Sequence, residues 1–327
     1  MAERILVTGG AGFIGSNYVR RVLEGRYPEQ KGAHVTVLDK LTYAGNPGNL
    51  ADVADDPRLD FTRGDIVDRG LVASLLDGVD LVVHFAAESH VDRSISGSAE
   101  FITTNVVGTH TLLQCALEAG VGRFVHVSTD EVYGSIAEGS WSETCPLEPN
   151  SPYSASKASS DLIARAYHRT HGLDVRITRC SNNYGPRQHP EKFIPKAVTN
   201  LARGVPVPLY GEGVNVRDWL HVDDHCRAIA LVAAEGRPGE VYNIGGGTEL
   251  TNRELTGRLL DIMGADWSAV QRVADRPGHD LRYSVDHSKV TRELGYRPEV
   301  PLDEGLAGTV RWYLDNPDWW ELAAQRA

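Results

Sequence analysis

A glycine-rich segment directly follows the first apolar run of the chain. Ile5 to Thr8 forms that run, and the next residues are Gly9-Gly10-Ala11-Gly12-Phe13-Ile14-Gly15. Between a strand and a helix, glycines let the backbone approach a pyrophosphate, whose charge then faces the amino end of the helix. An ordinary strand-to-helix turn is the alternative. The position of the glycines favours the first strand, turn and helix of a nucleotide-binding sheet.

Short apolar runs alternate with helix-length segments through the first half of the sequence. Further strands are expected at Val35 to Leu38, Leu81 to Phe85, Phe124 to Val127 and Val175 to Thr178, and helices at Phe13 to Glu24, Ala99 to Ala119 and Pro152 to Thr170. Strands that alternate with helices predict a parallel sheet covered on both faces. The fold class is therefore α/β, with a Rossmann-type doubly wound parallel sheet formed by residues 1–182.

The alternation weakens after residue 182, which predicts a second, smaller lobe of mixed α/β structure over residues 183–327. Asn182 to Gly213 is rich in Pro, Gly and Asn and suits a crossover. Residues 219–245, with a helix at Val222 to Ala234, are expected to pack back on the first lobe. Other helices are expected at Asn252 to Met263, Ser288 to Leu294 and Leu302 to Asn316.

Composition limits the class of partner. The formal net charge of −11 disfavours nucleic acids and anionic membranes, and we expect a small-molecule ligand. No apolar run reaches the roughly eighteen residues of a membrane span, and no leader is evident at the start, so we expect a cytoplasmic protein. The four cysteines are scattered, which argues against both disulfides and a zinc site.

Asp39 ends the second predicted strand, where a carboxylate can accept hydrogen bonds from ribose hydroxyls and would repel a 2′-phosphate. This position favours NAD over NADP as the cofactor. Gly64-Asp65-Ile66 is placed to cap the adenine, and Ala86-Ala87-Glu88 is placed to line the dinucleotide.

Tyr153 and Lys157 stand one helical turn apart, just after Pro152. A phenol with a reference pKa of about 10 acts as a base near neutral pH only beside positive charge, which Lys157 and an oxidised nicotinamide ring would supply. With Thr129, the pair suggests a hydride-transfer site at which an alcohol loses its proton to Tyr153. A surface tyrosine and lysine at helical spacing are the alternative.

Asp130 and Glu131 follow the strand that ends at Val127. If the strand ends in a turn, both carboxylates can face one pocket, and their repulsion raises the pKa of one of them. An acid beside a base suits elimination of water, once oxidation to a ketone has acidified the neighbouring carbon. An acidic pair that caps a helix is the alternative.

His221-Val222-Asp223-Asp224-His225 places two histidines four residues apart with carboxylates between them. This spacing can suggest a metal site. We favour a helix start instead, with Asp223 or Asp224 capping the apolar helix that follows. No metal is therefore expected.

Several longer segments resemble the extended short-chain dehydrogenase/reductase family, and among its members the dehydratases of nucleotide sugars. They include 39–46, 86–94, 129–134, 179–186, 216–219, 275–280 and 312–316. The glycine motif is shared by the whole family, whereas the Thr129-Asp130-Glu131 triplet is much more selective. The resemblance implies NAD, a cytoplasmic homodimer paired through the helices near 99–119 and 152–170, and dTDP-glucose as the small-molecule partner.

The resemblance also implies a role for individual residues. It implies that NAD is bound by Gly9, Gly12, Phe13, Ile14, Gly15, Asp39, Lys40, Thr42, Gly45, Asp65, Ile66, Ala86, Ala87, Ser89, Thr104, Tyr153, Lys157 and Asn183. It implies that the sugar nucleotide is bound by His90, Thr129, Asn182, Lys192, Phe193, Pro208, Tyr210, Arg217, Asn252, Arg276 and His279.

The reaction that the resemblance implies is a dehydration of deoxysugar biosynthesis, including that of rhamnose. Tyr153 takes the proton of the glucose C4 hydroxyl as hydride passes to NAD, Glu131 takes the C5 proton, and Asp130 protonates the departing C6 hydroxyl. Hydride then returns to C6. Thr129 orients the sugar and Lys157 assists Tyr153.

Two other functions remain open at this point. A nucleotide-sugar 4-epimerase or decarboxylase would use the same tyrosine, lysine and NAD, but would need no acid at Asp130. A non-catalytic NAD-binding protein on the same scaffold is the alternative from another class.

Overall fold

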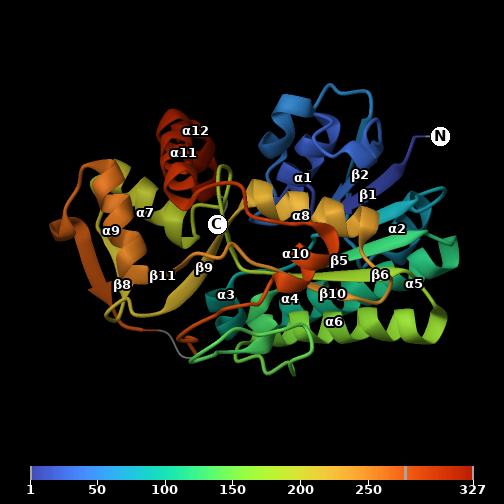
Figure 1. Cartoon of the computed structure of the whole chain (residues 1–327). Helices are drawn as coiled ribbons and strands as arrows, with labels where there is room; N and C mark the ends of the chain where they lie inside the picture. The colour runs from blue at the N-terminus through green and yellow to red at the C-terminus, as the bar shows by residue number, and fades with distance from the viewer. Residues whose placement is uncertain (1, 276–277, 326–327) are drawn as a thin grey trace.

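The computed structural model describes residues 2–275 and 278–325, and its centre is a seven-stranded sheet (Figure 1). Its order is β10-β6-β5-β4-β1-β2-β3, and every pairing is parallel. The strands are β1 (Arg4–Thr8), β2 (His34–Asp39), β3 (Leu59–Arg63), β4 (Leu81–His84), β5 (Arg123–Thr129), β6 (Val175–Cys180) and β10 (Val241–Ile244). Strand order reverses between β1 and β4, where such sheets open a crevice at their carboxyl ends. The predicted doubly wound parallel sheet is confirmed.

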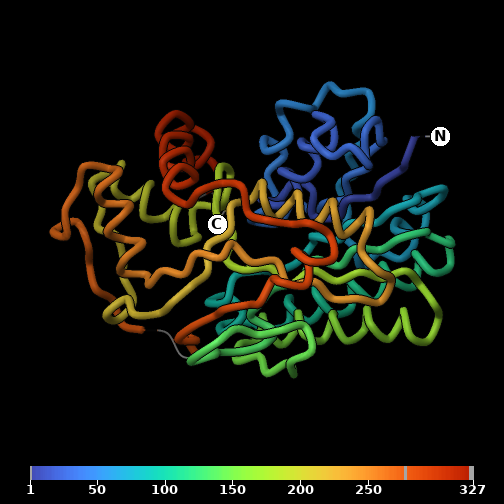
Figure 2. The backbone as a smooth tube through the Cα atoms, in the orientation of Figure 1, coloured from blue at the N-terminus to red at the C-terminus, as the bar shows by residue number. Residues whose placement is uncertain are grey.

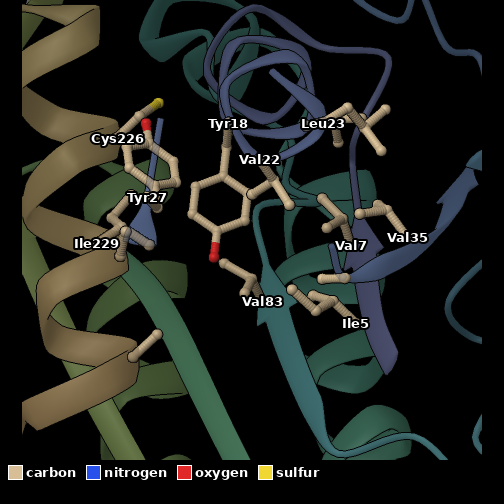
Figure 3. Packing of buried hydrophobic residues seen from close by; sticks show 14 of the residues in the cluster. Ile5, Val7, Tyr18, Val22, Leu23, Tyr27, Val35, Val83, Cys226 and Ile229 are labelled. Atoms are coloured by element: carbon tan, nitrogen blue, oxygen red, sulfur yellow. The ribbon is translucent and has the colours of Figure 1, made fainter. Parts of the chain in front are cut away.

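Helices α1 (Phe13–Leu23) and α8 (Val222–Glu235) cover one face of this sheet. Figure 3 shows Tyr18 and Val22 of α1 packed with Val7 of β1 and Val83 of β4, and Ile229 of α8 in the same cluster. Complete burial of one such aliphatic side chain contributes about 1.5–3 kcal/mol. Apolar runs at the strands and an apolar stripe on each helix therefore position the glycine turn between β1 and α1.

The opposite face is covered by α2 (Arg69–Leu75), α5 (Thr109–Ala119) and α6 (Pro152–His171). The single helix expected over Ala99 to Ala119 is wrong in detail. It consists of α4 (Ala99–Phe101), the π-helical segment η3 (Ile102–Gly108) and α5. Segment η3 contains five β-branched residues, which lower helix propensity, and the periodicity of apolar residues does not distinguish a π turn from an α turn.

The second lobe contains α7 (Phe193–Ala202), α9 (Asn252–Met263), α11 (Leu302–Asp315) and α12 (Pro317–Gln325), whose apolar faces share one core. It also contains a mixed sheet of β11 (Glu249–Thr251), β9 (Val216–His221) and β7 (Asn182–Tyr184), and the pair β12 (Val270–Val273) and β8 (Val207–Tyr210). The predicted smaller mixed lobe is confirmed. The sequence did not predict α7 and α12: α7 lies within the segment 182–213, which was interpreted as a crossover, and α12 begins at Pro317.

The chain returns from the second lobe to the first, as the tube in Figure 2 lets the reader follow. Strand β10 pairs with β6 at the edge of the large sheet, and α10 (Ser288–Leu294) packs against β10 and α8. Short helical segments complete the first lobe: η1 (Pro28–Gln30), η2 (Pro47–Val53), α3 (Val91–Ser96) and η4 (Asp130–Tyr133). A further short helix, η5 (Trp267–Ala269), precedes β12. No helix in the described part of the chain is long and apolar enough to cross a membrane.

Candidate active site

A cavity of about 310 Å³ lies at the carboxyl ends of the parallel strands, where the crevice is expected. Every residue predicted to bind NAD lines this cavity, and so do all five predicted catalytic residues, Thr129, Asp130, Glu131, Tyr153 and Lys157. The first lobe thus brings together segments that are more than a hundred residues apart in the sequence.

The glycine turn forms one wall of the cavity, and its backbone is tightly packed against neighbouring backbone atoms. A Cβ on Gly9 would lie 2.6 Å from the Ala86 backbone nitrogen, and Gly9 has a φ of +71°, which favours glycine. A Cβ on Gly15 would lie 2.3 Å from the carbonyl oxygen of Gly9. Helix α1 therefore approaches the turn closely, and its amino end has no side-chain cap at Gly12. This arrangement fits a bound pyrophosphate.

Asp39 ends β2 beside that turn. Its Oδ2 accepts a hydrogen bond from the Ala11 N–H at 2.9 Å, and its Oδ1 accepts one from the Leu41 N–H at 2.8 Å. Burial raises the pKa of Asp39, while the two N–H groups oppose the rise. Because a carboxylate can accept about four hydrogen bonds, lone pairs remain for ribose hydroxyls. Nearby, Lys40 forms an ion pair with Asp65 at 2.8 Å.

Tyr153 and Lys157 lie in the first turns of α6. The helix begins with a capping box, in which the Ser151 and Ser154 hydroxyl oxygens each accept a hydrogen bond from the other residue's backbone N–H, at 3.1 and 3.0 Å. Lys157 is 4% exposed, and its Nζ donates to the Val127 carbonyl oxygen at 2.8 Å. Burial lowers the pKa of Lys157 to about 8, although Asp161 on the next turn opposes this change.

Tyr153 is 8% exposed, and its ring contacts Phe101 edge-on. Burial and then the charge of Glu131 raise the pKa of the phenol well above its usual value, and a hydrogen bond with Thr129 opposes the rise. The surrounding groups of the protein therefore raise the pKa of Tyr153, whereas the sequence predicted that Lys157 would lower it. Positive charge from an oxidised nicotinamide ring would oppose the rise.

Asp130 and Glu131 open the short helix η4, which turns away from the end of β5. Thr129 Oγ1 accepts from the Glu131 N–H at 3.3 Å and donates to Asp130 Oδ1 at 3.2 Å. Burial, and next the charge of Glu131, raise the pKa of Asp130 well above its usual range. Asp130 Oδ2 is buried without a hydrogen-bond partner in the described part of the chain. This environment favours the protonated form of Asp130, beside a second carboxyl group.

A buried network that the sequence did not predict supports this turn. Arg179 of β6 is 1% exposed and donates to Asp161 Oδ2 at 2.8 Å and to the Tyr133 hydroxyl at 2.7 Å. Tyr133 closes η4 and donates to Asn243 Oδ1 at 2.9 Å. Asp161 stands four residues after Lys157, and this i, i+4 spacing was the available signal.

The residues predicted to bind substrate are more dispersed. Thr129, Asn182 and Lys192 line the cavity, whereas His90, Phe193, Pro208, Tyr210, Arg217, Asn252 and His279 are outside its lining. Arg217 donates to the carbonyl oxygens of Val216 and Asp280 and lies over the Tyr283 ring at 4.3 Å. His279 Nδ1 and Asp275 Oδ1 are 2.6 Å apart. Arg276 is outside the described residues.

The segment at 221–225 begins α8, but the predicted capping residues are wrong. His221 is the N-cap, and its ring accepts from the Asp223 N–H at 3.2 Å. Asp223 instead binds Arg21 at 2.8 Å, and Asp224 accepts from the Glu299 and Val300 N–H groups. Tertiary partners from distant segments compete successfully for both carboxylates. No group of three or more metal-ligating side chains that could hold an ion occurs among the described residues.

Comparison with known proteins agrees with this geometry. The family model described as GDP-mannose 4,6 dehydratase matches residues 6–309. The chain belongs to this family. This membership confirms the expected resemblance to extended short-chain dehydrogenases/reductases.

Individual relatives are similar over nearly their whole length. A dTDP-glucose 4,6-dehydratase of Streptomyces antibioticus is 64% identical over 98% of this chain and 96% of that protein. The structure of DesIV, a dTDP-glucose 4,6-dehydratase of Streptomyces venezuelae solved with NAD bound, is 70% identical, with a TM-score of 0.97 over 98% of this chain and 99% of that one. A UDP-glucose 4-epimerase of Thermotoga maritima is 33% identical, with a TM-score of 0.88 over 96% and 99%.

Proposed function

We infer that this protein is an NAD-dependent hydro-lyase that converts dTDP-glucose into dTDP-4-keto-6-deoxy-glucose, a precursor of deoxysugars. The observation that carries this inference is that Asp130 and Glu131 line the same cavity as Tyr153 and Lys157. A site for oxidation alone requires the last two residues. The additional pair supplies an acid and a base for loss of water.

The residues present fit NAD. The turn at Gly9, Gly12 and Gly15 has no space for an added Cβ at Gly9 or Gly15, so the backbone is free to approach a pyrophosphate. Asp39 ends β2, where the ribose would lie. Bound there, NAD accepts a hydride from the sugar and later returns it. A carboxylate at Asp39 favours NAD over its 2′-phosphorylated form.

The chain's own groups divide the remaining chemistry. Tyr153 takes the proton of the C4 hydroxyl, and Lys157 stabilises the phenolate that accepts it. With C4 oxidised, Glu131 removes the C5 proton. Asp130, whose pKa burial raises, gives its proton to the C6 hydroxyl, which leaves as water. After hydride returns to C6, a proton returns to C5, so the net change is loss of one water.

We propose that residues 183–327 bind the nucleotide sugar and that residues 1–182 bind NAD. Asn182 and Lys192 already line the cavity from the boundary of the second lobe. Arg217, in the second lobe, acts on the acid pair: its positive charge lowers the pKa of Asp130. We further propose a homodimer in the cytoplasm, paired through η3 and α6, where the apolar residues Ile102, Val107 and Leu162 are exposed.

The decisive experiment incubates the purified protein with dTDP-glucose in heavy water and follows the mass of the sugar nucleotide. Loss of one water with gain of one carbon-bound deuterium at C5 is expected. An unchanged mass, also after NAD is supplied, would refute the dehydratase. A 4-epimerase would give dTDP-galactose of the same mass, which chromatography separates from the substrate.

A further inference from the structure

The C-terminal helices α11 and α12 reach from the second lobe to the cofactor half of the site. Helix α11 packs against α7 and α9, and both helices are drawn in red in Figure 1, where they stand across from the blue segments of the first lobe. Trp312, Tyr313 and Trp319 form an aromatic cluster on this helix pair, with ring centroids 5.0–6.3 Å apart. The proposed reaction assigns this cluster no role.

One bridge runs from the cluster to the glycine turn. Trp319 Nε1 donates to Asn49 Oδ1 at 3.0 Å, and Asn49 Nδ2 donates to the Ala11 carbonyl oxygen at 2.9 Å. Asn49 belongs to η2 and is 1% exposed. The Ala11 carbonyl also accepts from the Asn46 N–H at 3.0 Å. Since Ala11 belongs to the glycine turn, Trp319 contacts the cofactor site through a single intervening side chain.

A second bridge begins at Arg187, whose guanidinium lies 5.7 Å from the centre of the Trp312 ring and donates to Asp52 Oδ2 at 2.6 Å. Arg187 has a φ of +69°, a conformation that non-glycine residues keep only where their surroundings impose it. The next residue, Gln188, lines the cavity, and the Tyr313 hydroxyl donates to its carbonyl oxygen. Both bridges hold segments that border the dinucleotide site.

The segment between β2 and the end of η2 covers the glycine turn. Thr42 and Gly45 of this segment line the cavity, and Asn46 and Asn49 fix it to Ala11. Departure of a dinucleotide that lies against both the turn and this cover requires the two to separate. Hydrogen bonds that hold them together therefore slow its release.

We propose that the C-terminal helix pair clamps η2 onto the glycine turn and thereby sets how slowly NAD leaves, with Trp319 and Asn49 as positioning residues. The proposal rests on the proposed function only for the identity of the cofactor. Slow release suits a cycle in which the same NAD is reduced and reoxidised on one sugar. Through the clamp, helices of the second lobe act on a cofactor that is bound mainly by the first lobe.

The test compares Trp319→Phe with Trp320→Phe. Both substitutions remove an indole N–H and keep an aromatic ring, but Trp320 Nε1 donates to the Tyr313 carbonyl within the helix pair. Each protein is loaded with radiolabelled NAD and chased with excess unlabelled NAD, and the label retained on a filter is followed over time. Because Asn49 Oδ1 would lose its buried partner, W319F should release NAD about tenfold faster, the factor that corresponds to about 1.4 kcal/mol. W320F should match the wild type.

A second readout separates the clamp from general destabilisation. In W319F the apparent KM for NAD should rise by a larger factor than any fall in kcat, while the melting temperatures of the two variants fall by similar amounts. Asn49→Ala should accelerate release as W319F does, and the double variant should release NAD no faster than N49A alone. Additive effects of the two substitutions would contradict the proposed path.

Equal release rates in W319F and W320F overturn the proposal, whether both are raised or both are unchanged. If W319F fails to fold, Asp52→Asn tests the second bridge, since the Asp52 side chain is 57% exposed. This variant should release NAD about two- to threefold faster, and an unchanged rate would count against the clamp. A wild-type protein that binds no NAD would instead refute the proposed function.

Discussion

The cofactor half and the substrate half of this site differ in what holds their residues. In the cofactor half the wall of the cavity is formed largely by backbone, at Gly9 and Gly15 and at the ends of parallel strands. In the substrate half the long side chains Arg217 and His279 are already hydrogen-bonded to neighbouring protein groups. A backbone site is fixed once the sheet forms. A site made of long side chains depends on how the second lobe packs.

The acid pair lies where the two halves meet. Its short helix is held through its last residue, Tyr133, which accepts a hydrogen bond from Arg179 of β6. The charge of Arg217 from β9 lowers the pKa of Asp130. The elimination step therefore draws on both halves. Substitutions can separate their contributions.

The largest expected effect comes from Asp130→Asn at this junction. Without the acid, the C6 hydroxyl has no positioned proton donor, and turnover should fall about 10²- to 10⁴-fold. Oxidation at C4 should persist, so the absorbance of reduced cofactor should accumulate after dTDP-glucose is added. Quenched-flow mass spectrometry should detect the 4-keto sugar before loss of water.

Glu131→Gln provides the matched comparison for D130N. It should also block loss of water, but it should in addition abolish exchange of the C5 proton with heavy water, which D130N should retain. A D130N protein that turns over at the wild-type rate would favour the 4-epimerase. Identical exchange in both variants would contradict the separate roles of the two carboxyl groups.

The next largest effect concerns Lys157, which is buried in the first turns of α6. Folding lowers its pKa from 10.5 to about 8, so the unfolded chain binds more protons than the folded chain between these values. Stability should therefore rise with pH across this window, by at most about 3.5 kcal/mol at about 1.4 kcal/mol per pH unit. Urea unfolding from pH 8 to 10 measures the slope.

Lys157→Met is the control for that slope, because methionine keeps an unbranched side chain of nearly the same length and cannot titrate. The difference between wild type and K157M isolates Lys157 from the tyrosines and thiols that ionise in the same range. A parallel pH dependence in the two proteins would mean that Lys157 is not desolvated as the structure shows. Activity should fall as pH rises through about 8, since Lys157 then loses its charge.

Gly15→Ala is expected to damage the cofactor half alone. The added Cβ would lie 2.3 Å from the Gly9 carbonyl oxygen, so α1 must move away from the turn. Overpacking of this kind costs about 1–3 kcal/mol, which would weaken NAD binding by about 10- to 100-fold. Calorimetric titration with NAD measures it.

Gly308→Ala is the matched control for G15A. Gly308 lies in α11 with open space around its Cβ position, and alanine there should stabilise the helix by up to about 1 kcal/mol and leave NAD affinity unchanged. Unchanged NAD affinity in G15A would mean that the glycine turn does not form the pyrophosphate site.

Arg217→Gln should weaken binding in the substrate half and leave the cofactor half unchanged, the opposite of what G15A should do. Charge-assisted hydrogen bonds are worth about 1.5–3 kcal/mol, so the KM for dTDP-glucose should rise by at least about tenfold while the affinity for NAD stays the same. Arg272→Gln, at an exposed ion pair with Glu212, should change neither quantity. A loss of NAD affinity in R217Q would show that the two halves are not separable.

The contrast between the halves also explains what the sequence could predict. The parallel sheet and the cavity at its carboxyl ends follow from periodicity and from the glycines after β1, because local patterns determine both. The convergence of Asp39 and Thr129 follows from the rule that the carboxyl ends of parallel strands meet at one edge, and Tyr153 joins them because α6 begins at that edge. These predictions required no knowledge of side-chain packing.

Other features depend on tertiary partners that no local pattern contains. Asp223 looks like a capping residue until Arg21 from α1 is placed beside it, and Arg179 looks like a surface charge until Asp161 and Tyr133 are found around it. Segment η3 likewise has the apolar spacing of an α-helix. Long side chains that choose between partners are therefore the hardest to assign from sequence.

The smallest expected effect is that of Lys40→Ala, which tests whether the cofactor half really depends on backbone. The Lys40 side chain is 49% exposed, and its ion pair with Asp65 is therefore worth about 0–1 kcal/mol. NAD affinity should fall less than about fivefold, and the fall should diminish in salt as the exposed charges are screened. Titration at two ionic strengths measures both. A loss as large as that of G15A would show that side-chain charge, rather than the glycine turn, dominates binding in this half.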